Sequence, residues 1–439
     1  MPVIAVMSGS VVQRGEPAFC NKWARAQMAV QNGADLVLEL PAVFSCRSAE
    51  FFAAGAVQLL AATGITDYLA FGAETAETQT LAAAAHFINT HQEELRAIIK
   101  SGDSYAAAQS TLLQNAGFTF AAAEANDILA LEYCRCLQKY APQIAPLVIR
   151  RCGAGYNSSD INAEYASASG IRTEYAAAGL SGRILKQIPE RSHKLLETLH
   201  SLNLLGWNTA KLDALVLYKL CMLTEQQIAA ACECTEGLEH RLKAAAACPD
   251  MQSVVNSVSS KRYTKSRIRR LLMQLLLGND KTIFTEAKPQ YLRVLAFNSR
   301  GRSMLAQMRK TASLPVITKM GRNFKTASPA IPKKTILLYA SCKRILTPPT
   351  CWHYCKTAAK TTAKPITAIF NAAFSAGLIK TKPLTRKSKR LKFCLIIFFF
   401  VVLNFIAVIF LRRCKFAAFV VNGIAVIVQT LQGRLQIAA

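Results

Sequence analysis

The sequence of 439 residues predicts an α/β protein in which a parallel sheet occupies residues 1–180 and an all-helical region follows. Two observations support this class. Short apolar runs alternate with helical patterns over residues 1–180, which is typical of βαβ units and of a parallel sheet covered on both faces. From residue 185 to 285 the only hydrophobic periodicity is helical.

A third observation, the distribution of charge, separates the end of the chain from the rest. All 26 acidic residues lie before residue 287, whereas 27 of the 53 Lys and Arg residues follow that position. The net charge of +27 therefore belongs to residues 287–439, and residues 1–286 are neutral overall. Because folded domains mix both signs on their surface, we expect residues 325–439 to form an atypical, acid-free tail.

The tail contains a hydrophobic run at 393–411 in which Asn404 is the only polar residue. The run is long enough to span a bilayer. One interpretation is therefore a real transmembrane segment. The other is a non-native sequence from a different reading frame or a foreign segment, and the abnormal composition favours this second interpretation.

Apolar runs predict strands at residues 3–7, 35–40, 68–71 and 146–149, and helical patterns occupy 20–32, 48–63 and most of 77–140. Ser48 is a suitable helix N-cap, and Gly33 and Gly64 follow helices as C-cap glycines do. Ligands bind parallel sheets at the carboxyl ends of the strands. We therefore expect a binding site in the loops that follow Met7, Phe71 and Ile149.

Two segments carry residue types that bind phosphate. The first is the loop from Met7 to Pro17, with Arg14, Lys22 and Arg25 nearby, and a phosphate site and an ordinary solvated loop explain it equally well. The second is ASASGIR at 166–172, where small hydroxyl residues precede an arginine. By itself this second pattern favours an N-cap with a surface arginine over a phosphate site.

Residues 261–270 read KRYTKSRIRR and predict a basic helix. On a helix, Arg262, Lys265 and Arg269 share one face, which would either contact an RNA backbone or be solvated. The clustering favours RNA, because the surrounding sequence is neutral. The six candidate RNA-binding residues are Lys261, Arg262, Lys265, Arg267, Arg269 and Arg270.

The 14 cysteines are predicted to be reduced, because no secretory signal precedes them. The pairs Cys134/Cys136 and Cys232/Cys234 lie on apparent helices, where residues two apart point in different directions. They are expected to be buried thiols and not metal ligands. The segment 351–355 has two cysteines and a histidine but no second pair at zinc-finger spacing, so no metal site is predicted.

A series of motifs in one order gives the chain a family resemblance. Among them are VMSG at 6–9, QRGEPA at 13–18, KWAR at 22–25, GADLVLELP at 33–41, SAEFFAAGAV at 48–57, FGAE at 71–74, NDIL at 126–129, RRCGAGYN at 150–157, ASASGIR at 166–172, KRYTKSRIRRLL at 261–272 and YLRVLAFNSRGR at 291–302. The chain resembles the bacterial tRNA(Met) cytidine acetate ligases, of the nucleotidyltransferase-like group, over roughly residues 1–322.

The resemblance implies a Rossmann-like nucleotidyltransferase domain at 1–180 for ATP and acetate, and a helical tRNA-binding region at 185–324. It also implies a cytosolic ligase with ATP and acetate as substrates. Acetate would attack the α-phosphate of ATP to give acetyl-adenylate, and the acetyl group would pass to N4 of the wobble cytidine of elongator tRNA(Met). Mg²⁺ is compatible with this chemistry, and no protein partner is implied.

Carried over position by position, the resemblance places ATP contacts in the FGAE, NDIL and RRCGAGYN motifs and phosphate contacts in ASASGIR. These residues are Gly72, Asn126, Arg151, Ser169 and Arg172. Arg150 is the neighbour onto which the Arg151 assignment could shift. The basic segment 261–270 would contact tRNA.

The start of the sequence departs from the family pattern. Family members begin with an additional strand and a His-x-Gly-His motif that contacts the ATP phosphates, whereas this sequence begins at the second strand. No catalytic residue is therefore assigned, and we expect the first strand of the sheet to be missing and an edge to be exposed. The alternative function is a catalytically inactive tRNA-binding protein, tethered to a membrane if 393–411 spans one.

Overall fold

A computed structural model describes residues 1–74, 77–118, 125–152, 160–161, 163–235, 237–282 and 288–319, all within one compact unit, Met1–Lys360. The predicted tail at 325–439 and its hydrophobic run lie outside these ranges. Within them, no helix combines the length and the apolar character that crossing a bilayer requires. The predicted boundary between residues 180 and 185 stays a prediction.

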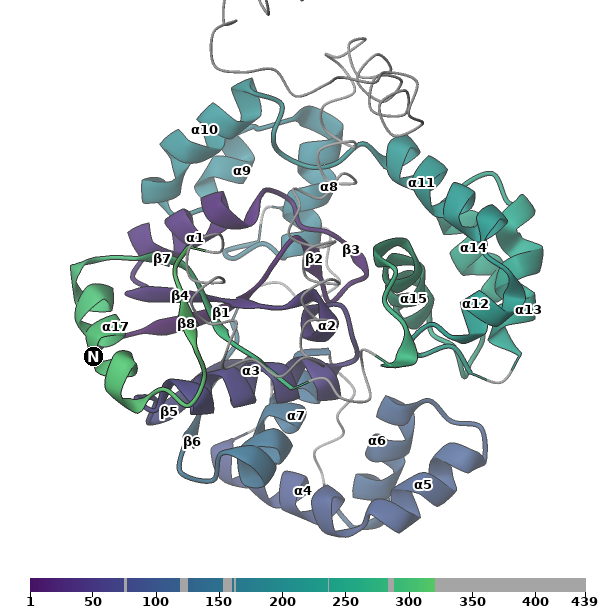
Figure 1. The fold of residues 1–439 in the computed structure, drawn as a ribbon, viewed down its shortest axis with the longest axis horizontal. Helices are drawn as coiled ribbons and strands as arrows, with labels where there is room; N and C mark the ends of the chain where they lie inside the picture. The colour runs from purple at the N-terminus through teal and green to yellow at the C-terminus, as the bar shows by residue number, and fades with distance from the viewer. Residues whose placement is uncertain are drawn as a thin grey trace, which may run out of the picture. The chain divides into compact units, whose positions relative to one another are not determined.

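The central sheet has the strand order β1-β4-β7-β8 (Figure 1). Strand β1 (Ile4–Ser8) runs parallel to β4 (Leu36–Leu40), with Ile4 opposite Leu36. Strand β7 (Leu292–Phe297) is antiparallel to β4 and parallel to the short β8 (Val316–Ile317). The sequence predicted β1 and β4 closely, but it did not assign β7, which returns from beyond the helical region to the first sheet.

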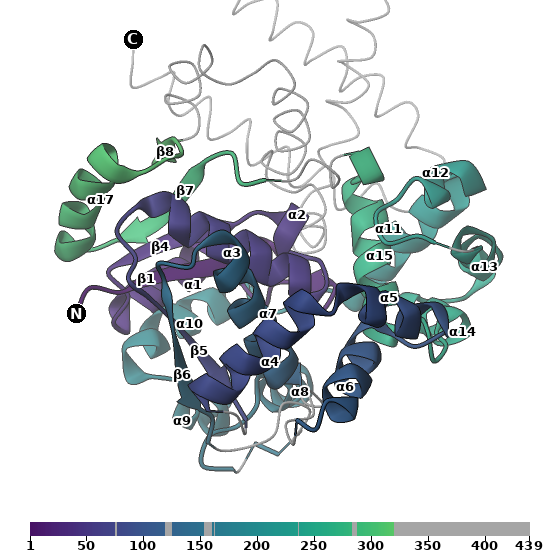
Figure 2. The ribbon, with the colours of Figure 1, turned by 90° about the horizontal axis from the view of Figure 1, so that it is seen from below.

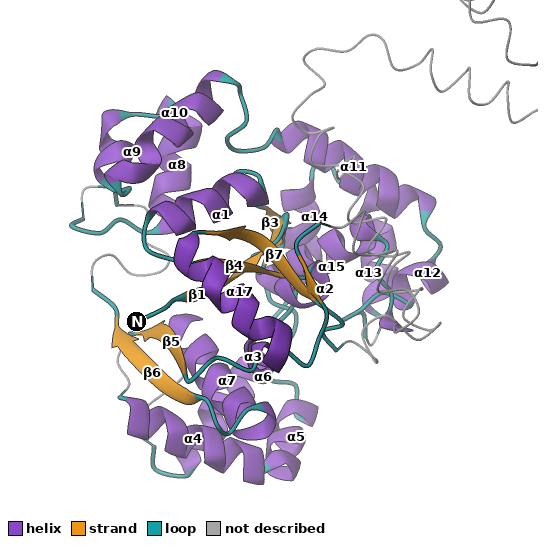
Figure 3. Ribbon diagram, turned by 60° about the vertical axis from the view of Figure 1, so that its left-hand side comes forward, coloured by secondary structure: helices purple, strands orange, loops and turns teal. Residues whose placement is uncertain are grey.

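Strands β5 (Tyr68–Ala73) and β6 (Ala145–Arg150) form a separate parallel pair (Figure 3). The predicted parallel strands are thus present, but the hydrogen-bonded ladder is interrupted between β1 and β5. The two sheets nevertheless share a core, because Ile4 and Val6 of β1 and Leu69 of β5 pack against the same apolar cluster. Among the described strands, β1 and β5 each have a single hydrogen-bonded neighbour.

Helices cover both faces of the central sheet. Val37 of β4 packs with Ala26 of α1 (Lys22–Gln31), whereas Leu36 and Leu38 pack with α3 (Ala49–Thr63) and α17 (Ser299–Thr311). This alternation follows from the two-residue period of a strand. Gly64 ends α3 in the left-handed conformation, as the sequence predicted, and the short helix α2 (Ala42–Ser45) precedes α3.

Four helices pack beside the β5–β6 pair (Figure 2). They are α4 (Thr78–Thr90), α5 (Gln92–Lys100), α6 (Tyr105–Asn115) and α7 (Ala125–Tyr140). Helix α7 links the β5–β6 pair to the central sheet. It contributes to the apolar cluster around β5, and it also packs against α3, which covers the central sheet.

Over residues 185–285 the described elements are helices, as predicted, but the wider predicted helical region at 185–324 also contains the strands β7 and β8. Helix α8 (Ala168–Ala178) precedes this region, and the helical elements that follow it are α9 (Gly182–Lys186), a 3₁₀ turn (Glu190–Ser192), α10 (His193–Ser201), α11 (Thr209–Met222), α12 (Glu225–Ala229), α13 (Leu238–Ala244), a second 3₁₀ turn (Ala245–Ala247), α14 (Met251–Val258) and α15 (Lys265–Leu277). Helices α11 to α15 enclose the largest apolar cluster, in which Leu271, Leu272 and Leu275 of α15 are buried.

The prediction that residues 261–270 form one helix is wrong in its first part. Helix α15 begins at Lys265, because the Thr264 side chain accepts a hydrogen bond from the Arg267 amide and caps the helix. Arg262 therefore precedes the helix and does not share a helical face with Lys265 and Arg269. The apolar stripe that the sequence predicted for the second half of this helix is confirmed.

The two cysteine pairs differ in their secondary structure but not in their burial. Cys134 and Cys136 lie on α7 as predicted, whereas Cys232 and Cys234 lie in the turn between α12 and α13 and not on a helix. The chain turns there because Glu233 adopts a left-handed conformation with φ of 65°. All four thiols are buried and free, and burial raises the pKa of Cys134 and of Cys232 to about 12.

Candidate functional site

The carboxyl ends of β5 and β6 bring together three of the five predicted ATP-contacting residues. Gly72 lies in β5, Arg151 follows β6, and Asn126 lies in the first turn of α7. The Glu74 carboxylate joins two of them: its Oε1 atom is 3.0 Å from Nε of Arg151 and accepts a hydrogen bond of 2.6 Å from Nδ2 of Asn126. We call Gly72, Glu74, Asn126 and Arg151 the β5–β6 group.

The backbone around this group is fixed by two further hydrogen bonds. The Glu74 amide donates to Oδ1 of Asp127 at 2.7 Å, and the Arg151 amide donates to the Ala73 carbonyl at 2.9 Å. A Cβ atom at position 72 would lie 3.1 Å from Cγ of Arg151, so a larger residue there would displace the Arg151 side chain. Glu74 was not among the predicted site residues, although it is the last residue of the FGAE motif.

The other two predicted ATP residues meet a hairpin that the sequence treated as a loop. Strands β2 (Val11–Val12) and β3 (Glu16–Pro17) pair antiparallel around residues 13–15. Nη1 of Arg14 donates to Oγ of Ser169 at 2.9 Å, and Nε of Arg172 lies 3.8 Å from Oε1 of Glu16. We call these four residues the hairpin group. Ser169 and Arg172 of this group lie in the first two turns of α8.

The N-cap interpretation of the ASASGIR motif is correct for Ser167. The Ser167 hydroxyl accepts hydrogen bonds from the amides of Ser169 and Gly170. The same motif also carries Ser169 and Arg172 of the hairpin group. The motif therefore caps α8 and also contacts the N-terminal hairpin. The sequence alone could not show this, because Arg14 and Ser169 are 155 positions apart.

Lys22 and Arg25, which follow the first strand, are partly buried and hydrogen-bonded to other parts of the protein. Nζ of Lys22 donates to both carboxylate oxygens of Glu39, at 2.7 and 2.8 Å, and the Arg25 guanidinium donates to the Gly9 carbonyl. Burial lowers the pKa of Arg25, although the nearby Cys20 and Glu39 act in the opposite direction. Glu39 thus neutralises charge at the carboxyl ends of β1 and β4.

The basic segment divides into bound and exposed charges. Nη2 of Arg267 donates to the Glu233 carbonyl at 3.0 Å and to Thr235 Oγ1 at 3.1 Å, and Nη2 of Arg269 donates to Gln252 at 2.6 Å. Lys261 and Lys265 are exposed. The exposed lysines carry the charge that a polyanion would meet first. In the described ranges, no group of three or more His, Cys, Asp or Glu side chains could hold a metal ion.

The sequence is similar to one protein family and to individual proteins of other organisms. Residues 1–346 match the family model described as HIGH Nucleotidyl Transferase. A tRNA(Met) cytidine acetate ligase of Thermoanaerobacter sp. (strain X514) is 38% identical over 329 residues, which span 73% of this chain and 81% of that protein. One from Acetivibrio thermocellus is 34% identical over 363 residues, 77% of this chain and 88% of the relative.

Solved structures of a similar protein have a similar fold. The apo form of Thermotoga maritima TmcAL superposes with a TM-score of 0.76 at 28% identity, over 81% of this chain and 88% of the other. A second structure of that protein, bound with alpha-thio ATP, superposes with a TM-score of 0.75 over the same shares.

Proposed function

The chain belongs to the HIGH nucleotidyl transferase family and to the tRNA(Met) cytidine acetate ligases, and on this premise we propose that it activates acetate with ATP and acetylates tRNA. In the first step an acetate oxygen attacks the α-phosphorus of ATP, and the bond to pyrophosphate breaks. In the second step N4 of the wobble cytidine of elongator tRNA(Met) takes the acetyl group and AMP leaves.

The observation that carries this proposal is the convergence of Asn126 and Arg151 on the Glu74 carboxylate, at the strand end that contains Gly72. A nucleotide bound at the carboxyl ends of β5 and β6 would meet the Arg151 charge and the Asn126 amide, while Gly72 keeps the strand end open. In the hairpin group, Arg14, Ser169 and Arg172 supply donors for the phosphates, whose charge shifts during adenylate formation.

Magnesium stays a prediction. It binds proteins through one or two carboxylates together with substrate phosphates, and does not need a cluster of protein ligands. Within the β5–β6 group, Glu74 supplies the carboxylate that would bind the ion. An ion carried by ATP would screen the charge of the phosphates. The cytosolic location also stays a prediction.

The test is acetate-dependent exchange of pyrophosphate into ATP, followed by analysis of N4-acetylcytidine in elongator tRNA(Met). Arg151→Ala should weaken ATP binding between about tenfold and about 150-fold, the equivalent of one charge-assisted hydrogen bond. Arg150→Ala is the matched control, because Arg150 is its exposed neighbour on β6. Equal ATP affinity in both variants would contradict the site assignment.

A chain that binds tRNA but shows no acetate-dependent exchange would instead have the alternative function, an inactive tRNA-binding protein. Membrane tethering through 393–411 would appear as sedimentation of the full-length chain with membranes that resist carbonate, lost on truncation before residue 380. These outcomes are separable, because the exchange assay requires neither tRNA nor a membrane.

A further inference from the structure

A cavity of about 520 Å³ lies where the basic segment faces the first turns of three helices of the N-terminal region. Helices α3, α6 and α7 contribute Glu50, Tyr105 and Ala125, and the basic segment contributes Arg262, Arg267 and Arg270. Its walls are mainly apolar, with charged groups at separate places. The space is large enough for a nucleotide, and it is distinct from the β5–β6 group.

The cavity adjoins both groups of predicted ATP residues. Ala125, in its wall, directly precedes Asn126 of the β5–β6 group. Arg14, also in its wall, donates to Ser169 of the hairpin group. A molecule in the cavity would therefore lie next to the place proposed for the activated acetyl group, as the second substrate of a transfer reaction must.

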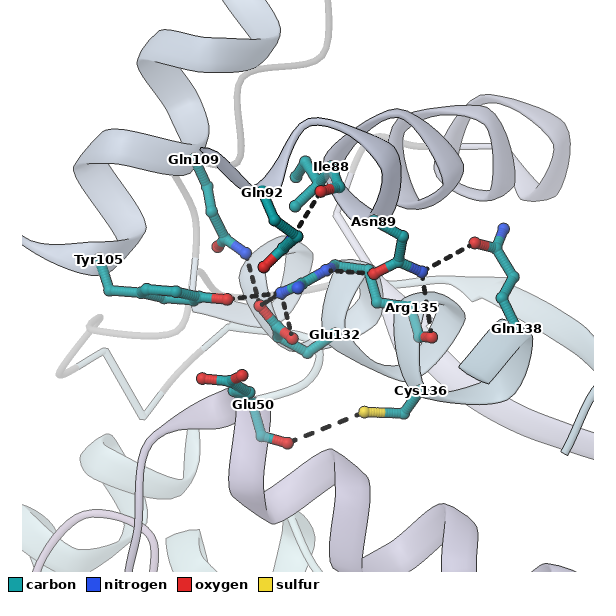
Figure 4. A network of polar contacts seen from close by, with 10 residues as sticks. All are labelled: Glu50, Ile88, Asn89, Gln92, Tyr105, Gln109, Glu132, Arg135, Cys136 and Gln138. Atoms are coloured by element: carbon teal, nitrogen blue, oxygen red, sulfur yellow. Dashed lines mark hydrogen bonds and ion pairs between the residues drawn. The ribbon is translucent and has the colours of Figure 1, made fainter. Parts of the chain in front are cut away.

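Tyr105 and Glu132, which line the cavity, belong to a network of polar side chains (Figure 4). Nη1 of Arg135 donates to both oxygens of Glu132, at 2.8 and 2.9 Å, and to Tyr105 Oη at 2.6 Å. Gln109 donates to the same Glu132 at 2.6 Å. The charges of Glu132 and Arg135 are thus paired with each other and not free, whereas Oε1 of Gln109 is buried with no hydrogen-bond partner among the described residues.

The Glu50 carboxylate, by contrast, has no such partner. Figure 4 shows it below Glu132 and Tyr105, and among the described residues no hydrogen bond or ion pair reaches its oxygens. The main-chain carbonyl of Glu50 accepts a contact of 3.8 Å from the Cys136 thiol, which helps to position the residue. A carboxylate that lines a cavity without a partner is an acceptor available to a ligand.

The basic segment contributes hydrogen-bond donors, whereas Glu50 contributes an acceptor. Arg262, Arg267 and Arg270 line the cavity here, and Nε of Arg270 lies 3.7 Å from the Glu233 carboxylate. Arginine is the side chain best suited to bind phosphate. Phe51 and Tyr105 add aromatic rings to the lining, on which a base taken out of its stack can rest.

We propose that this cavity receives the acceptor cytidine of the RNA, with its phosphate on the basic wall and its N4 amino group on Glu50. The inference rests on the proposed function, and it assigns Glu50 a role in the second step. As N4 forms its bond to the acetyl carbon, the bond from that carbon to the adenylate oxygen breaks and AMP leaves. The proton that N4 loses passes to the Glu50 carboxylate.

The first test measures binding. Two RNA hairpins with the anticodon arm sequence of elongator tRNA(Met) are compared, one with cytidine and one with uridine at the wobble position. Uridine carries an acceptor where cytidine carries the amino donor, so the full-length chain should prefer the cytidine hairpin about tenfold. Glu50→Gln should abolish that preference and retain the affinity for the uridine hairpin, which also shows that the variant is folded.

The control variant is Glu94→Gln, since Glu94 is an exposed carboxylate on α5 outside the cavity. It should keep the preference for cytidine. Equal affinity of the unsubstituted chain for the two hairpins, or an unchanged preference in Glu50→Gln, would overturn the proposal.

The second test measures transfer from supplied acetyl-adenylate to the cytidine hairpin, which bypasses the activation of acetate. Glu50→Gln should slow this transfer by about 10²-fold or more, as loss of a general base does. Transfer at the unsubstituted rate would overturn the role of Glu50. If the unsubstituted chain transfers supplied acetyl groups but shows no pyrophosphate exchange, the proposed function fails and the cavity assignment stands.

Discussion

Glu74 shows how much one residue organises at the candidate nucleotide site. Its carboxylate contacts the side chains of Arg151 and Asn126, and its amide is held by Asp127. Arg151 and Glu74 are only partly buried, with 36% and 21% of their side chains exposed, so solvent weakens their attraction. The pair therefore matters for the orientation of the guanidinium more than for stability.

This arrangement predicts that Glu74 and Arg151 are coupled in nucleotide binding. Substituting both with alanine should weaken ATP binding by less than the sum of the single effects, with a coupling free energy of about 1 kcal/mol. Titration of ATP into the four proteins of the double-mutant cycle measures it. The pair Glu74→Ala and Arg150→Ala should be additive, and equal coupling in the two cycles would refute the geometry.

At the scale of elements, the β2–β3 hairpin connects three parts of the chain. Its Arg14 and Glu16 reach α8, and Gly15 lies against the backbone of α15. Gly15 has a φ of 74°, and a Cβ atom there would lie 2.5 Å from the carbonyl carbon of Arg269. Position 15 thus needs glycine both for its conformation and for the close approach.

We expect Gly15→Ala to lower the free energy of unfolding by about 2 kcal/mol or more, since a strained backbone alone costs about 1–3 kcal/mol. Gly117→Ala is the matched control: its φ of 78° is similar, but nothing lies within 4 Å of the added Cβ. Urea unfolding of both variants separates conformational strain from collision. A loss in Gly15→Ala no greater than that in Gly117→Ala would show that the hairpin does not press against α15.

Asp35 joins the ends of three elements and gives the fold a pH dependence. One carboxylate oxygen accepts from the Val3 amide and the other from the Asn298 side chain, both at 2.9 Å. These hydrogen bonds, with that from Asn298 first, lower the pKa of Asp35 below its usual value. Its stabilising effect is therefore complete above the unfolded pKa of about 3.9 and is lost as pH falls through the lower folded value.

Asp35→Asn should destabilise the protein by about 1.5–3 kcal/mol at pH 7, because it removes the charge from two hydrogen bonds. The difference from the unsubstituted chain should shrink as pH falls from about 3.9 through the lower folded pKa of Asp35, because the folded carboxylate then also becomes protonated. Thermal unfolding at pH 7 and pH 3 tests this, with the exposed Asp67→Asn as control. A difference that grows on acidification would have the wrong sign.

For the whole molecule, the basic segment predicts how RNA affinity depends on salt. Lys261 and Lys265 are exposed, and Lys261 pairs with the partly exposed Asp103 at 3.3 Å. Their removal should reduce the slope of log affinity against log salt by about 1.5, the contribution of two phosphate contacts. Filter binding of tRNA at several salt concentrations measures the slope.

The control for this measurement replaces Arg309 and Lys310, which are exposed on α17 outside the basic segment. That pair should leave the slope unchanged. If both double variants lose the same amount, RNA binding is a property of total charge and not of the basic segment.

The sequence by itself determined most elements of the N-terminal region and proposed the site residues. Short apolar runs predicted β1, β4, β5 and β6, and helical patterns predicted the helices between them, since local burial patterns are written in neighbouring residues. The family resemblance proposed Gly72, Asn126 and Arg151 as ATP contacts through their motifs, and these assignments stay predictions. The sequence missed β7, because a short run of six mostly apolar residues fits a strand or a buried helical turn equally well.

Only the tertiary structure decided which of these residues meet. The contact of Arg14 with Ser169, the packing of Gly15 on α15 and the cavity beside Glu50 all join residues more than fifty positions apart. It also decided that the described strands form three separate sheets and that Thr264 caps the basic helix. Such pairings depend on how whole elements bury their apolar faces against one another, and no local pattern in the sequence records that choice.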